Sequence, residues 1–263
     1  MLRFTSLGSG SSGNATLVES LSSDEGRCPT RVLIDCGLAP RQLAARLALR
    51  GLLVADIDAV FVTHEHSDHV GGVIALERRH GMPVWASAGT WQRATARLPR
   101  APAHCVARDG EPIAVGAITL WPFAVPHDAA EPLQLTCSDS AHRIGILTDL
   151  GEPTDAIARA LQGCDALLLE ANHDRSLLTS GAYPAWLKRR IGGDRGHLAN
   201  SQSASLLDAC RHAALQHVVA AHLSQQNNRP ELALAALRGA LGSATTCLSV
   251  ADAAHGCDWI EID

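Results

Sequence analysis

The stretch Phe61-Val62-Thr63-His64-Glu65-His66-Ser67-Asp68-His69-Val70-Gly71-Gly72 places five side chains of metal-ligating types directly behind an apolar run. That run, residues 57–62, is rich in β-branched and aromatic residues and predicts a buried strand. If the strand continued, neighbouring members of the polar set would face opposite sides of the sheet, and one ion could not collect them. We therefore expect the chain to turn at this point.

A loop at the end of the strand would let His64 and His66 face one cation while Asp68 and His69 face a second. Imidazole and carboxylate ligands suit Zn²⁺, Mn²⁺ and Fe²⁺, and no thiolate takes part. The alternative is a solvated turn that happens to be rich in His. Several His side chains this close would repel one another on protonation, so a metal site is the better interpretation.

The pattern His-x-His-x-Asp-His followed by Gly resembles the signature of the metallo-β-lactamase-fold hydrolases. The resemblance implies three further ligands, each after a later strand. The chain offers them as His127 in Pro126-His127-Asp128, Asp149 in Thr148-Asp149-Leu150-Gly151 and His222 in Ala221-His222-Leu223-Ser224.

The resemblance also implies how these residues share two divalent cations. One would be held by His64, His66 and His127, the second by Asp68, His69 and His222, with Asp149 bridging. Zn²⁺ is the first expectation, and Mn²⁺ and Fe²⁺ also suit the ligands. Two cations about 3.5–4 Å apart would share a hydroxide that acts as the nucleophile, so Asp68 and Asp149 count as catalytic as well as metal-binding.

A strand is expected over residues 31–37, ending on Asp35-Cys36-Gly37. The resemblance implies that Asp35 lies beneath the metal loop and holds it by hydrogen bonds, which is a common way to orient metal ligands. A strand-end Asp that is satisfied locally is the alternative.

Composition bounds the class of protein. With 263 residues, 46% of them hydrophobic, and no linker that divides the chain, we expect one domain over residues 1–263. No run of 18 apolar residues occurs and residues 1–6 lack the apolar stretch of a signal peptide, which predicts a cytoplasmic protein that does not enter a membrane. Eight cysteines without a Cys-x-x-Cys pair indicate reduced thiols.

The order of elements favours an α/β (α+β) fold with mixed sheets. Apolar runs predict strands at 2–7, 15–19, 83–86, 113–125, 133–137, 143–148, 166–170 and 216–221, and helices at 40–52, 70–80, 90–98, 153–161 and 230–241. Hairpin-like stretches intervene, so a purely parallel, doubly wound sheet fits poorly. The resemblance implies a four-layer αββα sandwich, two mixed sheets flanked by helices, with the ligand motifs in loops along one edge.

Five further blocks resemble the YycJ (WalJ) exonuclease-like subgroup of this fold: Gly8–Asn14, Pro126–Pro132, Leu169–Asp174, Gly193–Asn200 and His222–Pro230. They reach across most of the chain. The resemblance implies a phosphodiesterase that acts on DNA from the 5′ end. Gln134 and Ala199 depart from the subgroup's pattern, which bears on substrate contacts more than on catalysis.

Several residues are candidates for contact with a nucleic-acid backbone. Arg189, Arg190 and Arg195 precede His197, and such donors can hold phosphate. The alternative is a solvated helix face over residues 184–191. The glycine-rich loop that ends at Asn14 could present N–H groups to phosphate or be a tight turn.

His173 and His197 are candidates for phosphate contact or for protonation of the leaving group. Each is also a plausible structural His. The net charge of −5 argues against wholesale coating of nucleic acid, although a cleft enzyme depends on local charge.

The sequence therefore predicts a dinuclear metal-dependent hydrolase, a phosphodiesterase or 5′–3′ exonuclease with DNA as its substrate. One alternative is a hydrolase of small thiolesters or lactones, which would share the ligand set. Another is a non-catalytic regulatory protein that keeps the fold. Lactam hydrolysis fits poorly, because the set contains no Cys ligand. No oligomeric state is predicted.

Overall fold

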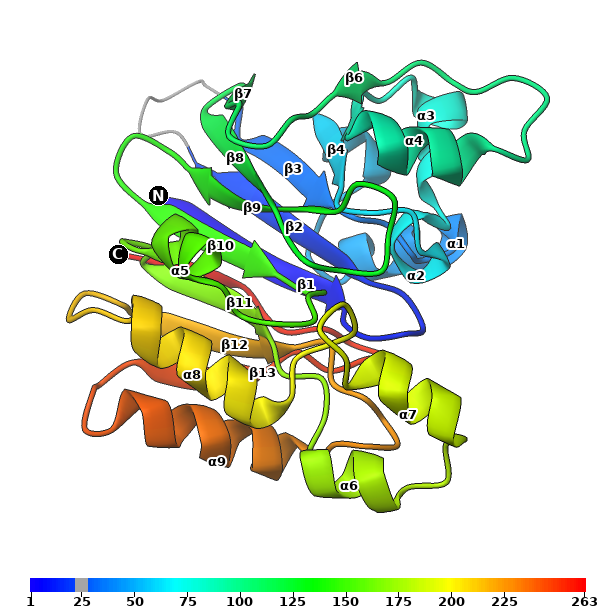
Figure 1. The fold of residues 1–263 in the computed structure, drawn as a ribbon. Coiled ribbons are helices and arrows are strands. Elements are labelled where there is room, and N and C mark those ends of the chain that lie inside the picture. Colours follow the sequence, from blue (N-terminus) through cyan, green and yellow to red (C-terminus); the bar gives the residue numbers. More distant parts are fainter. Residues whose placement is uncertain (22–27) are drawn as a thin grey trace.

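Two β-sheets packed face to face form the centre of the molecule (Figure 1). The computed structural model describes residues 1–21 and 28–263, and in this part of the chain fourteen strands divide equally between the sheets. The first sheet has the order β14-β1-β2-β3-β4-β5-β6 and the second the order β13-β12-β11-β10-β9-β8-β7.

The strands of the first sheet are β1 (Leu2–Gly8), β2 (Ala15–Ser20), β3 (Thr30–Ile34), β4 (Ala59–Val62), β5 (Val84–Ala86), β6 (Cys105–Val106) and β14 (Ile260–Ile262). Those of the second are β7 (Ile113–Val115), β8 (Ile118–Ala124), β9 (Leu133–Ser138), β10 (Arg143–Leu147), β11 (Ala166–Glu170), β12 (His217–Ala221) and β13 (Cys247–Val250). Both sheets are mixed: β14 to β3 and β7 to β10 pair antiparallel, whereas β3 to β6 and β10 to β13 pair parallel.

Helices cover the outer face of each sheet. On the first sheet these are α1 (Pro40–Ala48), α2 (Ser67–Val70), α3 (Val73–His80) and α4 (Ala88–Thr95), with the short 3₁₀ helix η1 (Val54–Asp56). On the second they are α5 (Asp155–Leu161), α8 (Asn200–Cys210) and α9 (Pro230–Leu241). A further pair, α6 (Arg175–Ser180) and α7 (Ala185–Ile191), lies beyond the end of the second sheet (Figure 1).

Three hydrophobic clusters hold the layers together. One lies between the sheets and joins Phe4 and Phe61 of the first sheet to Leu135 and Val219 of the second. A second packs the outer face of the second sheet against α5, α8 and α9, and a third packs the first sheet against α1, α3 and α4. Burial of apolar surface at three interfaces stabilises four layers, which is the αββα sandwich expected from the sequence.

The expected metal-loop geometry needs one correction. Asp68 and His69 do not lie in a loop but in α2, a single helical turn that ends at Val70, and the helix predicted over residues 70–80 begins later, at Val73. The break falls at Gly71 and Gly72. A Cβ on Gly72 would overlap the backbone oxygen of Leu38, so only glycine permits the close approach of the chain at this position.

Other elements were not expected or end elsewhere. Helices α6 and α8 and strands β6, β13 and β14 were missed, and α1 ends at Ala48 rather than residue 52. The strand predicted over residues 113–125 is two strands, β7 and β8. The remaining predicted strands and helices are present within a few residues of the expected bounds. No helix in the described residues is long and apolar enough to cross a membrane.

Strand register brings the polar loops to one edge. Ile34 lies beside Phe61 in the first sheet, and Leu147 beside Leu169 in the second. Glu170, the last residue of β11, lies beside Ala221 of β12. The carboxyl ends of β3, β4, β10, β11 and β12 therefore meet at the same edge, where catalytic loops on a rigid scaffold are normally found.

Candidate metal centre

The loop after β4 is held in place by two other segments of the chain. The backbone N–H of Asn14 donates to the oxygen of Asp68 at 2.7 Å, and that of Cys36 donates to the oxygen of His69 at 2.7 Å. Gly37 packs so closely that a Cβ there would overlap the backbone of Asp68. The position of α2 is thus fixed by close contact with the ends of β3 and the β1–β2 hairpin.

Asp35 holds this loop from beneath. Its Oδ1 accepts from the backbone N–H of Thr63 at 2.8 Å and its Oδ2 accepts from Thr63 Oγ1 at 2.8 Å. The same Oδ2 lies 2.8 Å from His69 Nδ1. Since one ring nitrogen of His69 is occupied by Asp35, the other, Nε2, is directed into the centre, 3.0 Å from Asp149 Oδ2.

One group of donor atoms comes from His64, His66 and His127. His64 Nε2 lies 3.0 Å from His66 Nδ1, and His127 Nε2 lies 3.3 Å from the same atom. The other nitrogen of His127, Nδ1, lies 3.0 Å from the carbonyl oxygen of Gly196, which orients the ring. All three residues offer an atom within 4.8 Å of the others.

A second group consists of Asp68, His69 and His222. Asp68 Oδ2 lies 3.6 Å from His69 Nε2 and 3.5 Å from His222 Nε2. Asn14, predicted as a phosphate contact, instead touches this group: its Nδ2 donates to Asp68 Oδ2 at 3.3 Å and lies 2.9 Å from His69 Nε2.

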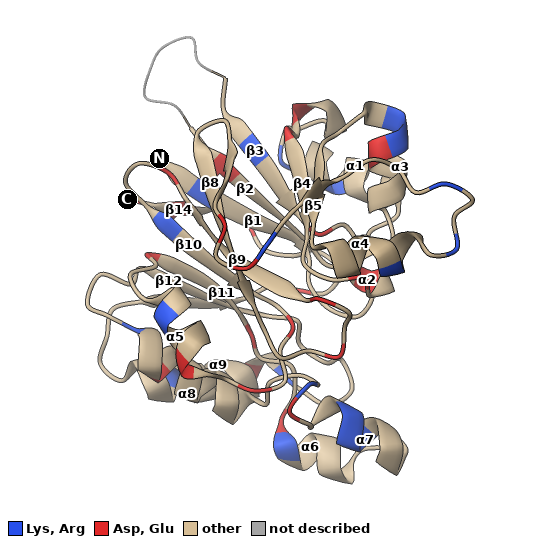
Figure 2. Cartoon of the chain, turned by 45° about the horizontal axis from the view of Figure 1, so that its top comes forward, with Lys and Arg blue, Asp and Glu red and all other residues tan. Residues whose placement is uncertain are grey.

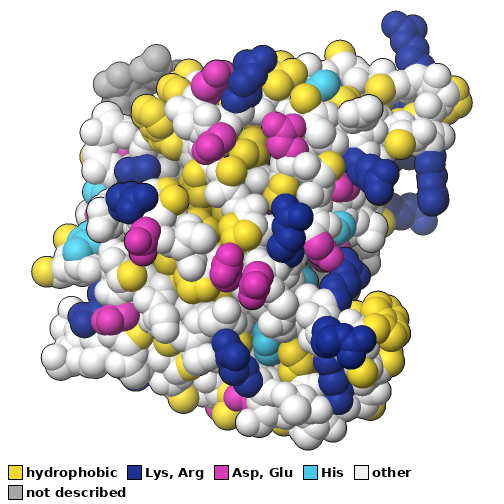
Figure 3. Space-filling model, viewed as in Figure 1, with side chains coloured by type: hydrophobic (Ala, Val, Ile, Leu, Met, Phe, Trp, Pro, Cys, Tyr) yellow, Lys and Arg dark blue, Asp and Glu magenta, His cyan; other side chains and the backbone are white. Residues whose placement is uncertain are grey.

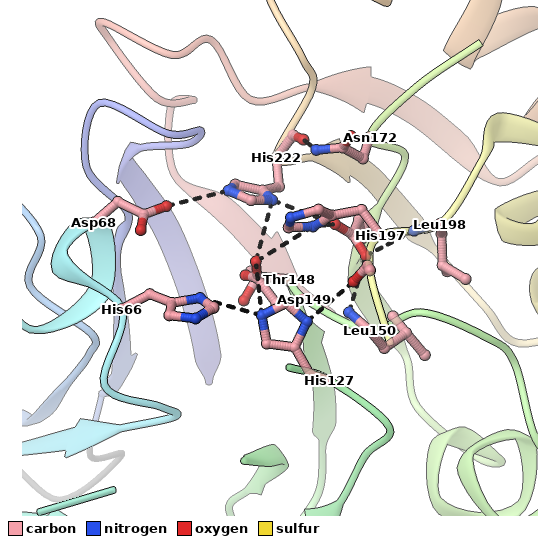
Figure 4. Close-up of polar contacts among 12 residues, drawn as sticks. His66, Asp68, His127, Thr148, Asp149, Leu150, Asn172, His197, Leu198 and His222 are labelled. Carbon is pink, nitrogen blue, oxygen red and sulfur yellow. Dashed lines mark hydrogen bonds and ion pairs between the residues drawn. The ribbon is translucent and has the colours of Figure 1, made fainter. Parts of the chain in front are cut away.

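Asp149 lies between the two groups (Figure 4). Besides the contact with His69, its Oδ1 lies 3.4 Å from His222 Nδ1, 3.5 Å from His197 Nδ1 and 3.9 Å from His127 Nε2. The side chain is almost fully buried. Its two oxygens thus face His69 and His222 of the second group, and Oδ1 also comes near His127 of the first, so this carboxylate is within reach of both groups.

The donor set fits divalent cations. Asp149 Oδ2 and His222 Nε2 are buried, and their neighbours His69 Nε2 at 3.0 Å and Asp68 Oδ2 at 3.5 Å form no hydrogen bond with them in the described structure. Buried polar atoms left in this way are costly unless another partner is bound. Ligand nitrogens at about 2.0–2.1 Å around a tetrahedral Zn²⁺ lie about 3.3 Å apart, close to the spacings within the first group.

Burial and charge set the protonation of the histidines. Burial lowers the pKa of His64 and of His127, so both rings are neutral and keep a lone pair for a cation. Burial also acts to lower the pKa of His222, but Asp149 and then Asp68 and Glu170 outweigh it and raise the pKa to about 10. A cation at this centre must therefore displace a proton, as metals commonly do.

Glu170 belongs to the centre, although sequence reasoning assigned it no role. Its Oε1 lies 2.7 Å from His197 Nδ1 and 3.3 Å from His222 Nδ1, and its Oε2 accepts from the backbone N–H groups of Leu150 and Leu198. It is fully buried. Its place at the carboxyl end of an apolar strand, like that of Asp149, is the signal that could have identified it.

The two histidines predicted to be catalytic, His173 and His197, lie in different pockets of the structure. His197 lies at the centre, between Glu170 and Asp149, and faces a pocket that also contains Asp128 and Arg190. His173 does not join the metal-ligand groups and lines a different pocket, on the other side of α7.

The three predicted arginines also separate. Arg190 donates to Asp128 Oδ2 at 2.5 Å, and Asp128 Oδ1 lies 3.5 Å from His127 Nε2. Arg189 lines the pocket that contains His173, and Arg195 is exposed in the loop after α7.

The chain is similar to known proteins over most of its length. The model of the family described as "Beta-lactamase superfamily domain" matches residues 30–223. A protein of Bacillus anthracis named exodeoxyribonuclease YycJ is 34% identical over 234 residues, which covers 88% of this chain and 86% of the relative. A protein of Streptococcus pneumoniae named exodeoxyribonuclease WalJ is 34% identical over 236 residues, covering 88% of this chain and 85% of the relative.

Solved structures share the fold at lower identity. The metallo-β-lactamase fold protein YhfI from Bacillus subtilis superposes with a TM-score of 0.73 at 14% identity, covering 98% of each chain. A diphosphatase from the PhnP family gives a TM-score of 0.66 at 19% identity, covering 98% of this chain and 96% of that one. Zn²⁺-bound PqqB from Methylobacterium extorquens gives a TM-score of 0.67 at 17% identity, covering 99% of this chain and 100% of that one.

Proposed function

The chain belongs to the β-lactamase superfamily, and from this premise we propose that it is a metal-dependent phosphodiesterase that degrades DNA from the 5′ end. The observation that carries the proposal is the identity with relatives named exodeoxyribonucleases, which extends over most of both chains. The convergence of every predicted ligand on one edge of the sandwich supports it.

Two divalent cations would be held at this centre. The first would bind His64, His66 and His127, the second Asp68, His69 and His222, and Asp149 would touch both. The absence of sulfur ligands favours Zn²⁺, Mn²⁺ or Fe²⁺, with Zn²⁺ the first expectation. Two buried ligand atoms, Asp149 Oδ2 and His222 Nε2, have no hydrogen-bond partner in the described structure, which supports the assignment.

Divalent cations bound here would lower the pKa of a water molecule and neutralise charge on the phosphate oxygens. The protein's own groups orient the reaction. Glu170 fixes the ring of His197 beside Asp149, and His197 also lines the adjoining pocket. A phosphodiester in that pocket would bring its leaving oxygen to His197, which would supply the proton.

We further propose that residues 1–263 act as one domain, because a single hydrophobic cluster joins the two sheets and the centre draws residues from both. All eight cysteines are free, as is usual in a reducing compartment, which supports a cytoplasmic location.

The test is hydrolysis of DNA by the metal-loaded protein and by two variants. Labelled single- and double-stranded DNA should be shortened from the 5′ end by the wild type, and His64→Ala and Asp149→Ala should abolish the activity. His80→Ala is a matched control, because His80 is an exposed His at the end of α3, outside the centre. Circular dichroism establishes that each variant is folded.

Two results would contradict the proposal. One is DNA hydrolysis that persists in folded His64→Ala or Asp149→Ala protein. The other is a wild-type protein that hydrolyses a thiolester or lactone and leaves DNA intact, which would favour a small-molecule hydrolase with the same ligands.

A further inference from the structure

A second pocket lies beside the metal centre, between α6, α7 and the chain that joins β11 to α6. Its volume is about 340 Å³, and its lining includes His173, Arg175, Lys188, Arg189 and Gln202. In Figure 2, Lys and Arg mark both α6 and α7, and Figure 3 shows Lys and Arg side chains gathered over the region of α7.

The positive charge of this pocket is not neutralised by the protein. Among the residues that the structure describes, Arg175, Lys188 and Arg189 form no ion pair, and no carboxylate lines the pocket. The nearest acid along the chain, Asp174, is engaged elsewhere, because its Oδ1 accepts from two backbone N–H groups at the start of α6. Three cations of this kind around one pocket attract an anion.

A buried and unpartnered side chain also lines it. His173 is only 2% exposed, and its Nδ1 is buried without a hydrogen-bond partner. Burial lowers the pKa of His173 to about 4, so the ring is neutral and carries one N–H donor. A buried ring nitrogen with no hydrogen-bond partner requires an explanation, and a group bound in this pocket supplies one.

Helix α7 separates this pocket from the cleft at the metal centre. Arg189 lines the basic pocket, whereas its neighbour Arg190 pairs with Asp128 on the side of His197. The two sides are closely linked, because the backbone N–H of His173 donates to Leu198 O at 3.3 Å, one residue beyond His197. A strand of nucleic acid at His197 could therefore place another phosphate in the basic pocket.

We propose that this pocket binds one phosphate group of the substrate strand, separate from the phosphate that is cleaved. The proposal rests on the function proposed above. A terminal phosphomonoester and an internal phosphodiester share the required chemistry, and Arg189, Arg175 and Lys188 would donate to the phosphate oxygens together with His173. A terminal phosphate is the more highly charged of the two sources.

Binding to metal-loaded protein tests the proposal without turnover. The probes are fluorescent single strands with hydrolysis-resistant phosphorothioate linkages, identical except for a 5′-phosphate or a 5′-hydroxyl. The variant is Arg189→Gln, and the matched control is Arg78→Gln, which removes the same charge from an exposed position on α3. Lys188→Gln is a second variant in case Arg189→Gln does not fold.

The two sources of phosphate give different results. If the pocket takes the terminal group, the wild type binds the 5′-phosphate strand about tenfold more tightly, and Arg189→Gln removes the preference. If it takes an internal phosphate, Arg189→Gln weakens the binding of both strands about equally. It also lowers the salt dependence of binding by the amount expected for about one phosphate contact. Either result supports the site, provided that Arg78→Gln behaves like the wild type.

The proposal would be overturned if the affinity for both strands changed equally in Arg189→Gln, Lys188→Gln and Arg78→Gln. Cleavage of unmodified DNA, measured in parallel, separates this failure from that of the proposed function. DNA that is cleaved without any contribution from Arg189 or Lys188 contradicts only the pocket. A wild-type protein that cleaves no DNA contradicts the phosphodiesterase itself.

Discussion

At the scale of single residues, the centre depends on carboxylates that face histidines rather than on the histidines alone. Asp35 occupies one nitrogen of His69, and Glu170 occupies one nitrogen of His222 and one of His197. Each contact selects which ring nitrogen remains for a cation or a substrate. Such partners orient the ligands, and their loss usually lowers the affinity for the metal.

Replacement of Glu170 should therefore weaken metal binding. Glu170→Gln keeps the size of the side chain but removes the charge near His222, and we expect the affinity for the divalent cation to fall about 10- to 100-fold. Competition with a chromophoric chelator measures it. Glu231→Gln, an exposed position at the start of α9, is the matched control. Equal affinities in the two variants would show that Glu170 has no such role.

The residues that could be predicted from the sequence are those with motif spacing. His64, His66, Asp68 and His69 are adjacent in the chain, and the resemblance supplied His127, Asp149 and His222. Glu170 belongs to no such spacing, and its proximity to His222 follows from strand register, which places it beside Ala221. Side-chain direction explains why Arg189 and Arg190, neighbours in sequence, serve different pockets.

At the scale of elements, α2 is positioned by close backbone contact rather than by its own helical propensity. It has only one turn, and an isolated helix of this length does not form in water. The glycine at residue 37 allows the ends of β3 and α2 to touch. The placement of Asp68 and His69 is therefore a consequence of packing.

Gly37→Ala should consequently damage both stability and the second ligand group. The added Cβ would overlap the backbone of Asp68, and we expect a loss of about 1–3 kcal/mol in the free energy of unfolding, together with weaker metal binding. Gly239→Ala is the control, because Gly239 lies within α9 with open space around its Cα. That change should stabilise the protein by up to about 1 kcal/mol.

Denaturant unfolding and metal content measure both effects. If Gly37→Ala matched the wild type in stability and in metal content, packing at residue 37 would not determine the position of α2.

Strong hydrophobic patterns explain which elements were predictable. The buried runs of β4, β11 and β12 and the Pro-initiated α9 were expected close to their observed bounds. Helix α8 is rich in serine and shows little amphipathic periodicity, so its sequence does not indicate a helix. Strand β14 has three residues and owes its existence to pairing with β1, where Leu2 lies beside Ile262. Such tertiary pairing is not visible in local sequence.

At the scale of the whole molecule, the centre joins the two sheets. Asp68 and His69 follow strands of the first sheet, whereas Asp149 and His222 follow strands of the second. A cation bound by both sets would cross-link the halves of the sandwich. The order of strands within the sheets could be anticipated only from the resemblance, because no local pattern specifies which distant strands pair.

Removal of the cations should accordingly destabilise the whole protein. A ligand present at 100 times its dissociation constant stabilises the folded state by about 2.7 kcal/mol. For a chain of this length, that corresponds to a fall in Tm of roughly 5–10 °C on chelation. Calorimetry with and without chelator measures the fall, and Asp149→Ala should show no response.

The shape of the calorimetric transition tests the domain organisation. One cooperative transition is expected of a single domain over residues 1–263. Two separate transitions, or an unchanged Tm after complete removal of metal, would contradict the cross-linked sandwich.

Asp35 and His222 share a left-handed backbone, with φ of 60° and 55°. Glycine, asparagine and aspartate adopt this conformation readily, whereas other residues such as His222 adopt it at an expense of about 1–2 kcal/mol. Asp35 also holds Thr63 by two hydrogen bonds, so laboratory evolution for heat resistance in the presence of a chelator should enrich glycine or asparagine at residue 222 alone. The selected variants would be more heat-resistant but would have lost their activity. A screen for stable variants of this enzyme must therefore select for activity as well.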